Sequence, residues 1–269
     1  MQNKINIDFK IRFQTPFHCG TGMSAGLIDR RVKRNNNGLI FIPASTFKGV
    51  LRNKIEDLIH ILNASNGNKL INIHPNDSYN TKILFYFHKE HKATPIERIF
   101  GSAAKSGSLF FQDLTMVDED KNFFKTGESG EKYDKLLQVE TRTQTTVYRT
   151  LNTVKQGSLF SSELGIKDLQ FQGRIYGWLN GIPVTLVETA HPHLISYELF
   201  FLILGMKLMD KIAADKSTGM GNFEYTDISL SVNSEKVDIE QNLFCDEIFD
   251  ALSLYNDEME IYEENKNTP

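Results

Sequence analysis

Residues 5–13 read INIDFKIRF, and this stretch decides the fold expected for the rest of the chain. Apolar residues occupy one set of alternate positions: Ile5, Ile7, Phe9, Ile11 and Phe13. Polar and charged residues occupy the other set: Asn6, Asp8, Lys10 and Arg12. Strict period-two alternation is typical of a β-strand with one face buried and the other in solvent. We therefore expect a half-buried strand at the start of the chain, with the core on its apolar side.

Working outward from this strand, the strong patterns alternate between strand and helix periods. Apolar residues at three- and four-residue steps predict helices at 45–62, where Ser45 is placed to cap, and at about 194–213. Strand patterns follow at 108–114, 169–177 and 223–230. The resulting order is βαββαβ, which is the plan of an α+β, ferredoxin-like domain with long insertions between its elements.

The connecting regions carry weaker signals. Glycine and asparagine punctuation predicts a loop at 20–26 and turns at 35–38 and 217–222. Charge and glycine content favour a mobile surface loop over 118–135. The remaining expectations are a short strand at 27–32, a strand at 83–87, a short helix at 95–101 and a projecting hairpin within 139–160.

Charge is distributed unevenly along the 269 residues. Residues 235–264 hold eleven acidic residues and one basic residue, whereas the rest of the chain holds 23 acidic and 29 basic residues. We expect residues 1–234 to form one domain, with insertions at about 63–107 and 115–165 that include the hairpin, and 235–269 to form an acidic tail with a short helix. The apolar residues Phe244, Ile248, Ala251, Leu252 and Tyr255 lie at helical spacing in that tail. Packing against the chain's own body is the favoured account of them, with a neighbouring protein as the alternative. A basic body permits a polyanion partner.

Cysteine usage and hydropathy narrow the class of protein. Cys19 and Cys245 are the two cysteines, and neither belongs to a zinc-ligand pattern. Apolar runs are far shorter than the ~20 residues of a membrane span, and the N-terminus lacks a signal-peptide pattern. These features predict a cytoplasmic protein that does not enter the membrane.

Polar specialisation is concentrated in residues 15–52, TPFHCGTGMSAGLIDRRVKRNNNGLIFIPASTFKGVLR. The segment combines a loop with three glycines, Gly20, Gly22 and Gly26, with Asp29, a run of four cations and a helix start that carries Lys48 and Arg52. A helix N-terminus beside cations favours anion binding. A carboxylate among phosphate-binding cations can hold a metal or move a proton during RNA scission. Each feature also has a simpler explanation. Asp29 can be an ordinary turn residue, the four cations can form a solvated surface, and Lys48 and Arg52 can snorkel, with their stems on apolar surface and their charges in water.

Several segments together resemble the RAMP superfamily of CRISPR–Cas proteins, in order along the chain from about Phe9 to Leu230. They are TPFHCGTG, GLID, IPASTFKGVLR, RIFGSAAKSGSLFFQD, VYRTLNTVKQGSLFSSE and STGMGN. Within that superfamily, the chain is most similar to backbone subunits of type III (Csm/Cmr-like) effector complexes.

The resemblance implies a modified RRM-like palm, a thumb-like β-hairpin and assembly of copies or related RAMP subunits into a filament. The implied partners are CRISPR RNA, target RNA and other type III effector subunits. It further implies cleavage of target RNA with Mg²⁺ or another divalent metal, for which Asp29 matches the catalytic and metal-binding position. The expected RNA contacts are Gly20, Gly22, Arg30, Arg31, Lys33, Arg34, Ser45, Thr46, Lys48, Arg52, Arg142, Tyr148, Arg149 and Lys155.

Two other functions remain open at this point. One is a non-catalytic RAMP subunit that caps or spaces the filament. The other is a stand-alone CRISPR RNA-processing endoribonuclease that uses His18, although a lone histidine is more often structural. His191 and His193 flank Pro192 before a helix, where capping or packing accounts for them.

Overall fold

A computed structural model of the chain describes residues 2–24, 26–65, 93–102, 106–126, 132–148, 150–185, 195–243, 252 and 255–267. Several predictions fall outside these residues. They are the strand at 83–87, the proposed RNA contact Arg149, the histidines His191 and His193, and Cys245, Phe244, Ile248 and Ala251 of the tail.

The described strands form one main sheet whose order is β11-β10-β1-β9-β4-β2, with β3 also paired to β9. Every pairing in it is antiparallel. The strands are β1 (Gln2–Phe13), β2 (Phe41–Ile42), β3 (Leu109–Phe111), β4 (Leu114–Met116), β9 (Gln170–Asn180), β10 (Phe223–Val232) and β11 (Glu235–Val237). The predicted strands 5–13, 169–177 and 223–230 correspond to β1, β9 and β10, and the predicted strand 108–114 corresponds to β3 and the start of β4. In the sheet, β1 lies between β9 and β10, and β3 and β4 lie on the far side of β9. This arrangement confirms the α+β, ferredoxin-like palm.

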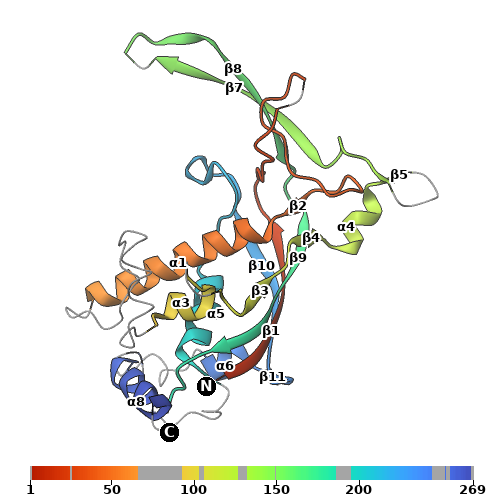
Figure 1. Ribbon diagram of the computed structural model, residues 1–269. Coiled ribbons are helices and arrows are strands. Elements are labelled where there is room, and N and C mark those ends of the chain that lie inside the picture. Colours follow the sequence, from red (N-terminus) through yellow and green to blue (C-terminus); the bar gives the residue numbers. More distant parts are fainter. Residues whose placement is uncertain are drawn as a thin grey trace.

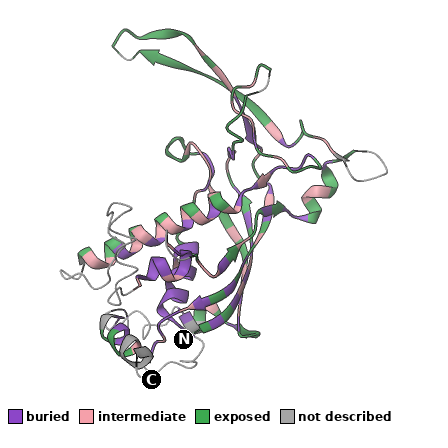
Figure 2. Ribbon diagram, viewed as in Figure 1, coloured by how far each residue is buried: buried purple, intermediate pink, exposed green. Residues whose placement is uncertain are grey.

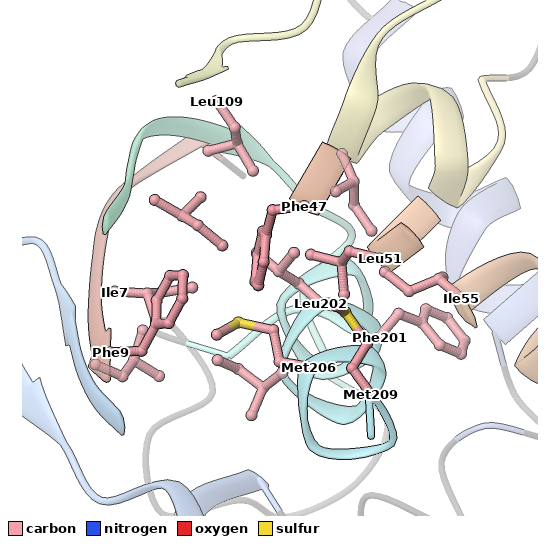
Figure 3. Close-up of a cluster of buried hydrophobic side chains, with 14 of the residues drawn as sticks. Ile7, Phe9, Phe47, Leu51, Ile55, Leu109, Phe201, Leu202, Met206 and Met209 are labelled. Atoms are coloured by element: carbon pink, nitrogen blue, oxygen red, sulfur yellow. The ribbon is translucent and has the colours of Figure 1, made fainter. Parts of the chain in front are cut away.

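Helices cover one side of this sheet (Figure 1). They are α1 (Ala44–Ser65), α3 (Pro95–Phe100) and α5 (Tyr197–Lys207). Residues of β1 alternate between buried and more exposed positions, so its isoleucines and phenylalanines face the helices. Figure 3 shows Ile7 and Phe9 of β1 packed against Phe47 of α1 and Met206 of α5. The helices and the inner face of the sheet thus share one hydrophobic core.

The helix α5 is apolar all round and lies inside the core. Ser196 caps it, because its side chain accepts a hydrogen bond from Leu199 N at 3.3 Å. A Cβ atom at Gly205 would lie 2.4 Å from Ile55 Cγ1, so glycine allows α5 to approach α1 closely. The helix ends at Lys207 and not near residue 213 as predicted. Met209 and Ile212 remain buried after the helix ends, which is why the apolar pattern outlasts it.

A two-stranded hairpin projects from the palm (Figure 1). It consists of β7 (Val139–Tyr148) and β8 (Thr153–Gly165), in antiparallel register from Val139–Gly165 to Tyr148–Thr153. This confirms the predicted hairpin. Most of its length is exposed, and only its base near Gly165 is buried (Figure 2).

The segment predicted as a mobile surface loop, 118–135, instead contains regular structure. It includes α4 (Asp118–Phe123) and the paired strands β5 (Lys125–Thr126) and β6 (Lys132–Tyr133). Phe124 is buried, and Asp120 Oδ2 accepts a hydrogen bond from Gln170 N at 2.7 Å. These two contacts attach the charged segment to the palm, and composition alone does not reveal them.

The C-terminal segment packs on the body. Its elements are β11, α6 (Ile239–Leu243) and α8 (Tyr255–Asn267), and β11 extends the main sheet. Leu252 and Tyr255 are buried in the hydrophobic core, which confirms that these predicted tail residues pack against their own chain. Among the described helices, none combines the length and hydropathy of a membrane span.

Candidate nucleic-acid interface

The glycine-rich segment after β1 folds back on itself as a narrow ribbon. Gly20 pairs with Val32, Thr21 N donates to Arg31 O at 3.0 Å, and Lys33 N donates to Cys19 O at 2.7 Å. Gly22 and Gly26, with φ of 76° and 60°, lie in the exposed bend between the two arms. The strand predicted at 27–32 is therefore wrong, because its residues form isolated bridges to two different partners.

The second of those partners is the base of the hairpin. Phe17 and Gly165 exchange two backbone hydrogen bonds, of 3.1 and 2.7 Å. A Cβ atom at Gly165 would lie 2.4 Å from the Phe17 ring, so this contact requires glycine. Farther along β8, Arg30 forms a parallel bridge with Ser162. The ribbon thus lies along β8, on the side away from β7, and fixes the base of the hairpin to the palm (Figure 1).

Asp29 lies where the ribbon meets β8. Its backbone N donates to Ser161 O at 2.9 Å, and its Oδ2 accepts from Ser161 N at 2.8 Å. The residue is exposed, so the carboxylate is held in a fixed place and still faces solvent. A charged carboxylate there can attract a cation or accept a proton.

Asp29 alone supplies few ligands for a divalent cation. Among the described residues, no group of three or more histidine, cysteine, aspartate or glutamate side chains is arranged to hold a metal ion. Mg²⁺ is commonly bound through one or two carboxylates plus waters and substrate phosphates. The donor set therefore fits such an ion only as one carboxylate ligand that a bound phosphate and water would complete.

The four cations of the run occupy different environments. Arg30 Nη1 pairs with Asp215 Oδ2 at 3.0 Å, which ties the ribbon to the turn that contains η1 (Lys216–Thr218). Arg31 is half-buried and Lys33 is exposed, with Lys33 Nζ 5.6 Å from the centre of the Phe41 ring. Arg34 Nη1 pairs with Glu163 Oε2 at 2.9 Å, and the two side chains are only 10% and 8% exposed. The run therefore divides into surface cations and one buried arginine.

Glu163 organises the buried side of the ribbon. Besides Arg34, its Oε2 accepts from Val32 N at 3.1 Å, and its backbone carbonyl bonds His18 Nδ1 at 2.7 Å. His18 is 5% exposed, so the geometry favours a structural role for it, as the lone histidine suggested. Burial raises the pKa of the neighbouring Cys19 thiol to about 12, which leaves it protonated and unreactive.

The start of α1 already has an anionic partner. Ala44 begins the helix, and Asp113 Oδ1 accepts from its backbone N at 2.7 Å. The prediction that Ser45 caps this helix is therefore wrong, because Ser45 lies inside the first turn, where it is exposed. A carboxylate at this position competes with a phosphate for the same N–H groups and positive end of the helix dipole.

The other predicted cations of α1 also have protein partners. Lys48 Nζ donates to Phe100 O at 3.3 Å and lies 5.4 Å from the centre of the Phe111 ring. Desolvation, followed by the nearby charge of Arg52, lowers the pKa of Lys48. Arg52 Nε pairs with Glu56 Oε1 at 2.9 Å. Both cations remain partly exposed, as does Thr46, so they line the helix surface without converging on a single point.

The hairpin brings only part of its predicted set to Asp29. Arg142 pairs in register with Ser162, one residue from the Ser161 that binds Asp29, and its side chain is 48% exposed. Tyr148 and Lys155 are exposed near the tip. Lys155 lies six residues from Ser161 along β8, or roughly 20 Å in a strand. Asp29 and Arg30 in the ribbon and Arg142 in β7 therefore flank the same stretch of β8, where Arg142 Nη2 also lies 3.8 Å from Glu140 Oε1, whereas the tip is a separate surface.

Three residues that organise the site were missed from the sequence: Asp215, Glu163 and Ser161. Each is distant in the chain from its partner in the ribbon. The one available signal was that Ser161 and Glu163 end the VYRTLNTVKQGSLFSSE segment, which resembles the RAMP superfamily. Nothing in the spacing indicated that Asp215 would meet Arg30.

Comparisons with known proteins agree with this fold. The sequence model of the RAMP superfamily matches residues 10–224. The structure is similar to a chain in the cryo-EM structure of the Type III-B Cmr-beta bound to cognate target RNA, with a TM-score of 0.50 and 15% sequence identity. The match covers 85% of this chain and 61% of that one, so this chain spans less than two thirds of its length. No curated protein matches the sequence.

Proposed function

The chain belongs to the RAMP superfamily, and from that premise we propose that it is an RNA-binding subunit of a type III CRISPR effector complex. The observation that carries the proposal is the cluster at the base of the hairpin. It consists of Asp29, whose exposed carboxylate is held in place by two contacts with Ser161, and of Arg30 and Arg142, which pair with Ser162 from the two sides of β8. Such a surface combines phosphate-binding cations with one group able to take part in chemistry.

RNA binding would depend mainly on phosphate contacts. Arg31, Lys33 and Arg142 are at least partly exposed cations of the ribbon and the hairpin, and guanidinium groups bind phosphate in a bidentate manner. Backbone contacts position a nucleic acid without reading its sequence. We propose CRISPR RNA as the guide, with target RNA selected by base pairing. We omit Arg34 from the contact set because its ion pair with Glu163 is buried, whereas Arg142, which lies 3.8 Å from Glu140, remains 48% exposed.

Cleavage of the target RNA is the finer proposal, and Asp29 is the residue assigned to it. In this scheme a ribose 2′-oxygen attacks the adjacent phosphorus, the bond from phosphorus to the 5′-oxygen breaks, and the leaving oxygen receives a proton from water. Asp29 would accept the proton of the 2′-hydroxyl or orient the phosphate through a bound cation. Mg²⁺ or another divalent metal would neutralise charge on the phosphate when bound.

One observation favours a non-catalytic subunit as the second candidate. Oδ2 of Asp29 already accepts a hydrogen bond from Ser161 N, a contact that suffices to explain the residue as a structural link between ribbon and hairpin. In that case the chain would bind RNA and space or cap a filament of related RAMP subunits without cutting.

An Asp29→Asn variant separates the two candidates. The amide oxygen can still accept from Ser161 N, so the loop stays in place while the charge is lost. With guide RNA, target RNA, Mg²⁺ and partner subunits present, we expect lost cleavage, unchanged RNA affinity and an unchanged melting temperature. Asp227→Asn, which removes an exposed carboxylate from β10, is the matched control. Cleavage by Asp29→Asn at the wild-type rate would assign the chain to the non-catalytic class.

A further inference from the structure

The outer face of the sheet, on the side away from α1, α3 and α5, carries polar residues and three exposed aromatic rings. The alternation that buries one side of β1 and β9 directs Lys4, Asn6, Arg174, Tyr176 and Trp178 outward. Phe110 of β3 faces the same way. Phe110 is 58% exposed, Tyr176 39% and Trp178 47%, although large aromatic side chains are mostly buried in folded proteins.

The rings form one platform because three strands are in register there. Phe110 pairs with Tyr176, and their ring centroids lie 5.6 Å apart with an interplanar angle of 26°. Gly177 permits this approach, since a Cβ atom there would lie 2.2 Å from Ser108 O. Tyr176 and Trp178 are two residues apart on one strand, or about 7 Å. That distance is close to two base-stacking steps of about 3.4 Å each.

Cations and hydrogen-bonding side chains surround the platform. Lys4 pairs in register with Trp178 and is exposed. A depression of about 370 Å³ lies beside Tyr176, and its lining includes Lys4, Asn6, Gln112, Arg174 and Ser231. Arg174 is anchored by an ion pair with Asp8. Amide, hydroxyl and ammonium groups of this kind can bond base edges, ribose hydroxyls and phosphate.

We propose that this platform, formed by Phe110, Tyr176 and Trp178 with Lys4, binds single-stranded RNA by base stacking. The surface is distinct from the cluster at Asp29, which lies beyond the opposite end of β9, roughly 23 Å along the strand. The proposal adds a second RNA surface to the function proposed above, and either surface can exist without the other. Sheets that bind single strands do so with aromatic side chains on an open face.

The composition of the face favours RNA over a protein partner. The outward side chains of β1 and β9 are glutamine, asparagine, lysine, arginine, aspartate, tyrosine and tryptophan, with no aliphatic residue among them. Protein interfaces share an enrichment in aromatic residues and arginine, but their fully buried centre is more apolar and is depleted in lysine and aspartate. Here isolated flat rings stand among hydrogen-bonding groups, an arrangement that suits bases and their sugars.

Trp178 makes the proposal directly testable, because it is the one tryptophan of the chain. A base stacked on its ring would quench its fluorescence. We would titrate the full chain with a single-stranded octamer of uridine and follow tryptophan emission. In parallel, the anisotropy of the same RNA carrying a fluorescent label would report binding at any surface. We expect saturable quenching.

Variants locate the quenching site. Tyr176→Ala should weaken the affinity measured by quenching about tenfold, or about 1.4 kcal/mol, whereas Tyr176→Phe should preserve it. Lys4→Gln should reduce the salt dependence by about 0.7 in the slope of log affinity against log salt. Phe123→Ala, an exposed ring on α4, is the control and should leave the quenching affinity unchanged. Arg31→Ala removes a proposed contact of the ribbon and tests whether that surface contributes to the signal.

The outcomes are distinguishable. Anisotropy that reports binding while Trp178 emission stays constant would overturn this proposal and leave the proposed RNA-binding function intact. Loss of quenching in Arg31→Ala would also overturn it, since the signal would then come from the other surface. Quenching that depends on protein concentration without RNA would identify the platform as a contact between copies of the chain and refute RNA stacking. Absence of both signals would contradict both proposals.

Discussion

Replacing Arg34 with methionine tests whether this arginine supports the fold or contacts RNA. Arg34 and Glu163 form a buried ion pair, with side chains 10% and 8% exposed. Removing one partner of a buried pair leaves an uncompensated charge and costs about 3–5 kcal/mol. In a domain of this size, 1 kcal/mol shifts the melting temperature by about 2–4 °C. We therefore expect Arg34→Met to melt about 6–20 °C below the wild type.

The double variant Arg34→Met with Glu163→Met gives the interaction energy. Losing both charges removes the uncompensated charge, so the double variant should be more stable than the sum of the single effects predicts. It should remain below the wild type, because Val32 N loses the acceptor that Glu163 Oε2 provides at 3.1 Å. Lys33→Met is the control, since Lys33 is exposed and its replacement should change stability by less than about 0.5 kcal/mol.

Thermal unfolding, monitored by circular dichroism, measures the contribution of Arg34 to stability. The anisotropy of labelled RNA, measured with the folded variants, reports its contribution to RNA binding. The structural account predicts a large loss of stability and little loss of RNA affinity in Arg34→Met. An Arg34→Met protein that melts within a degree of the wild type yet binds RNA weakly would refute it. Arg34 would then be an RNA contact, as the sequence alone suggested.

Two further predictions concern stability. Gly177 has a φ of 137° and lies against Ser108 O, so Gly177→Ala should cost more than about 1 kcal/mol of unfolding free energy. Gly49→Ala, in an open part of α1, should instead stabilise the protein by about 0.4–1 kcal/mol. Equal melting temperatures for the two variants would contradict this account. Burial raises the pKa of Glu198 from 4.5 to about 7, so its contribution to stability is complete below pH 4.5 and is lost as pH rises through 7. The melting temperature of the wild type should fall between pH 4.5 and 7 more than that of Glu198→Gln, and parallel pH profiles would refute the assignment.

The fold was predictable where local periodicity and burial coincide. The alternation in 5–13 and the strand and helix order were sufficient for the ferredoxin-like plan, because each element buries a face whose period is visible in the sequence. Contacts between distant residues were not predictable in this way. The cap on Ala44 comes from Asp113, and Arg34 meets Glu163 only because the ribbon folds onto β8. A list of cations cannot distinguish a buried pair from an exposed phosphate contact.

The phase of an alternating strand, as well as its period, can be read from the sequence. The buried phase of 169–177 holds Leu169, Phe171 and Ile175. The opposite phase of the same strand holds Arg174, Tyr176 and Trp178, which therefore had to face away from the core. Large aromatic residues on the exposed phase of a strand are a sequence-level indication of a binding face. Asp29, by contrast, was identified by resemblance, and its contact with Ser161 needed the structure.

The central place of β1 has a consequence for synthesis of the protein. Ile5 pairs with Gly177 on one side and with Val232 on the other, so the first strand made must wait for the last part of the domain. At translation rates of about 5–20 residues per second, that wait is roughly 10–45 s. During it, the alternating isoleucines and phenylalanines of β1 emerge from the ribosome with both edges unpaired. We expect nascent chains to engage a chaperone early and completed chains to fold slowly, as proteins with many long-range contacts do.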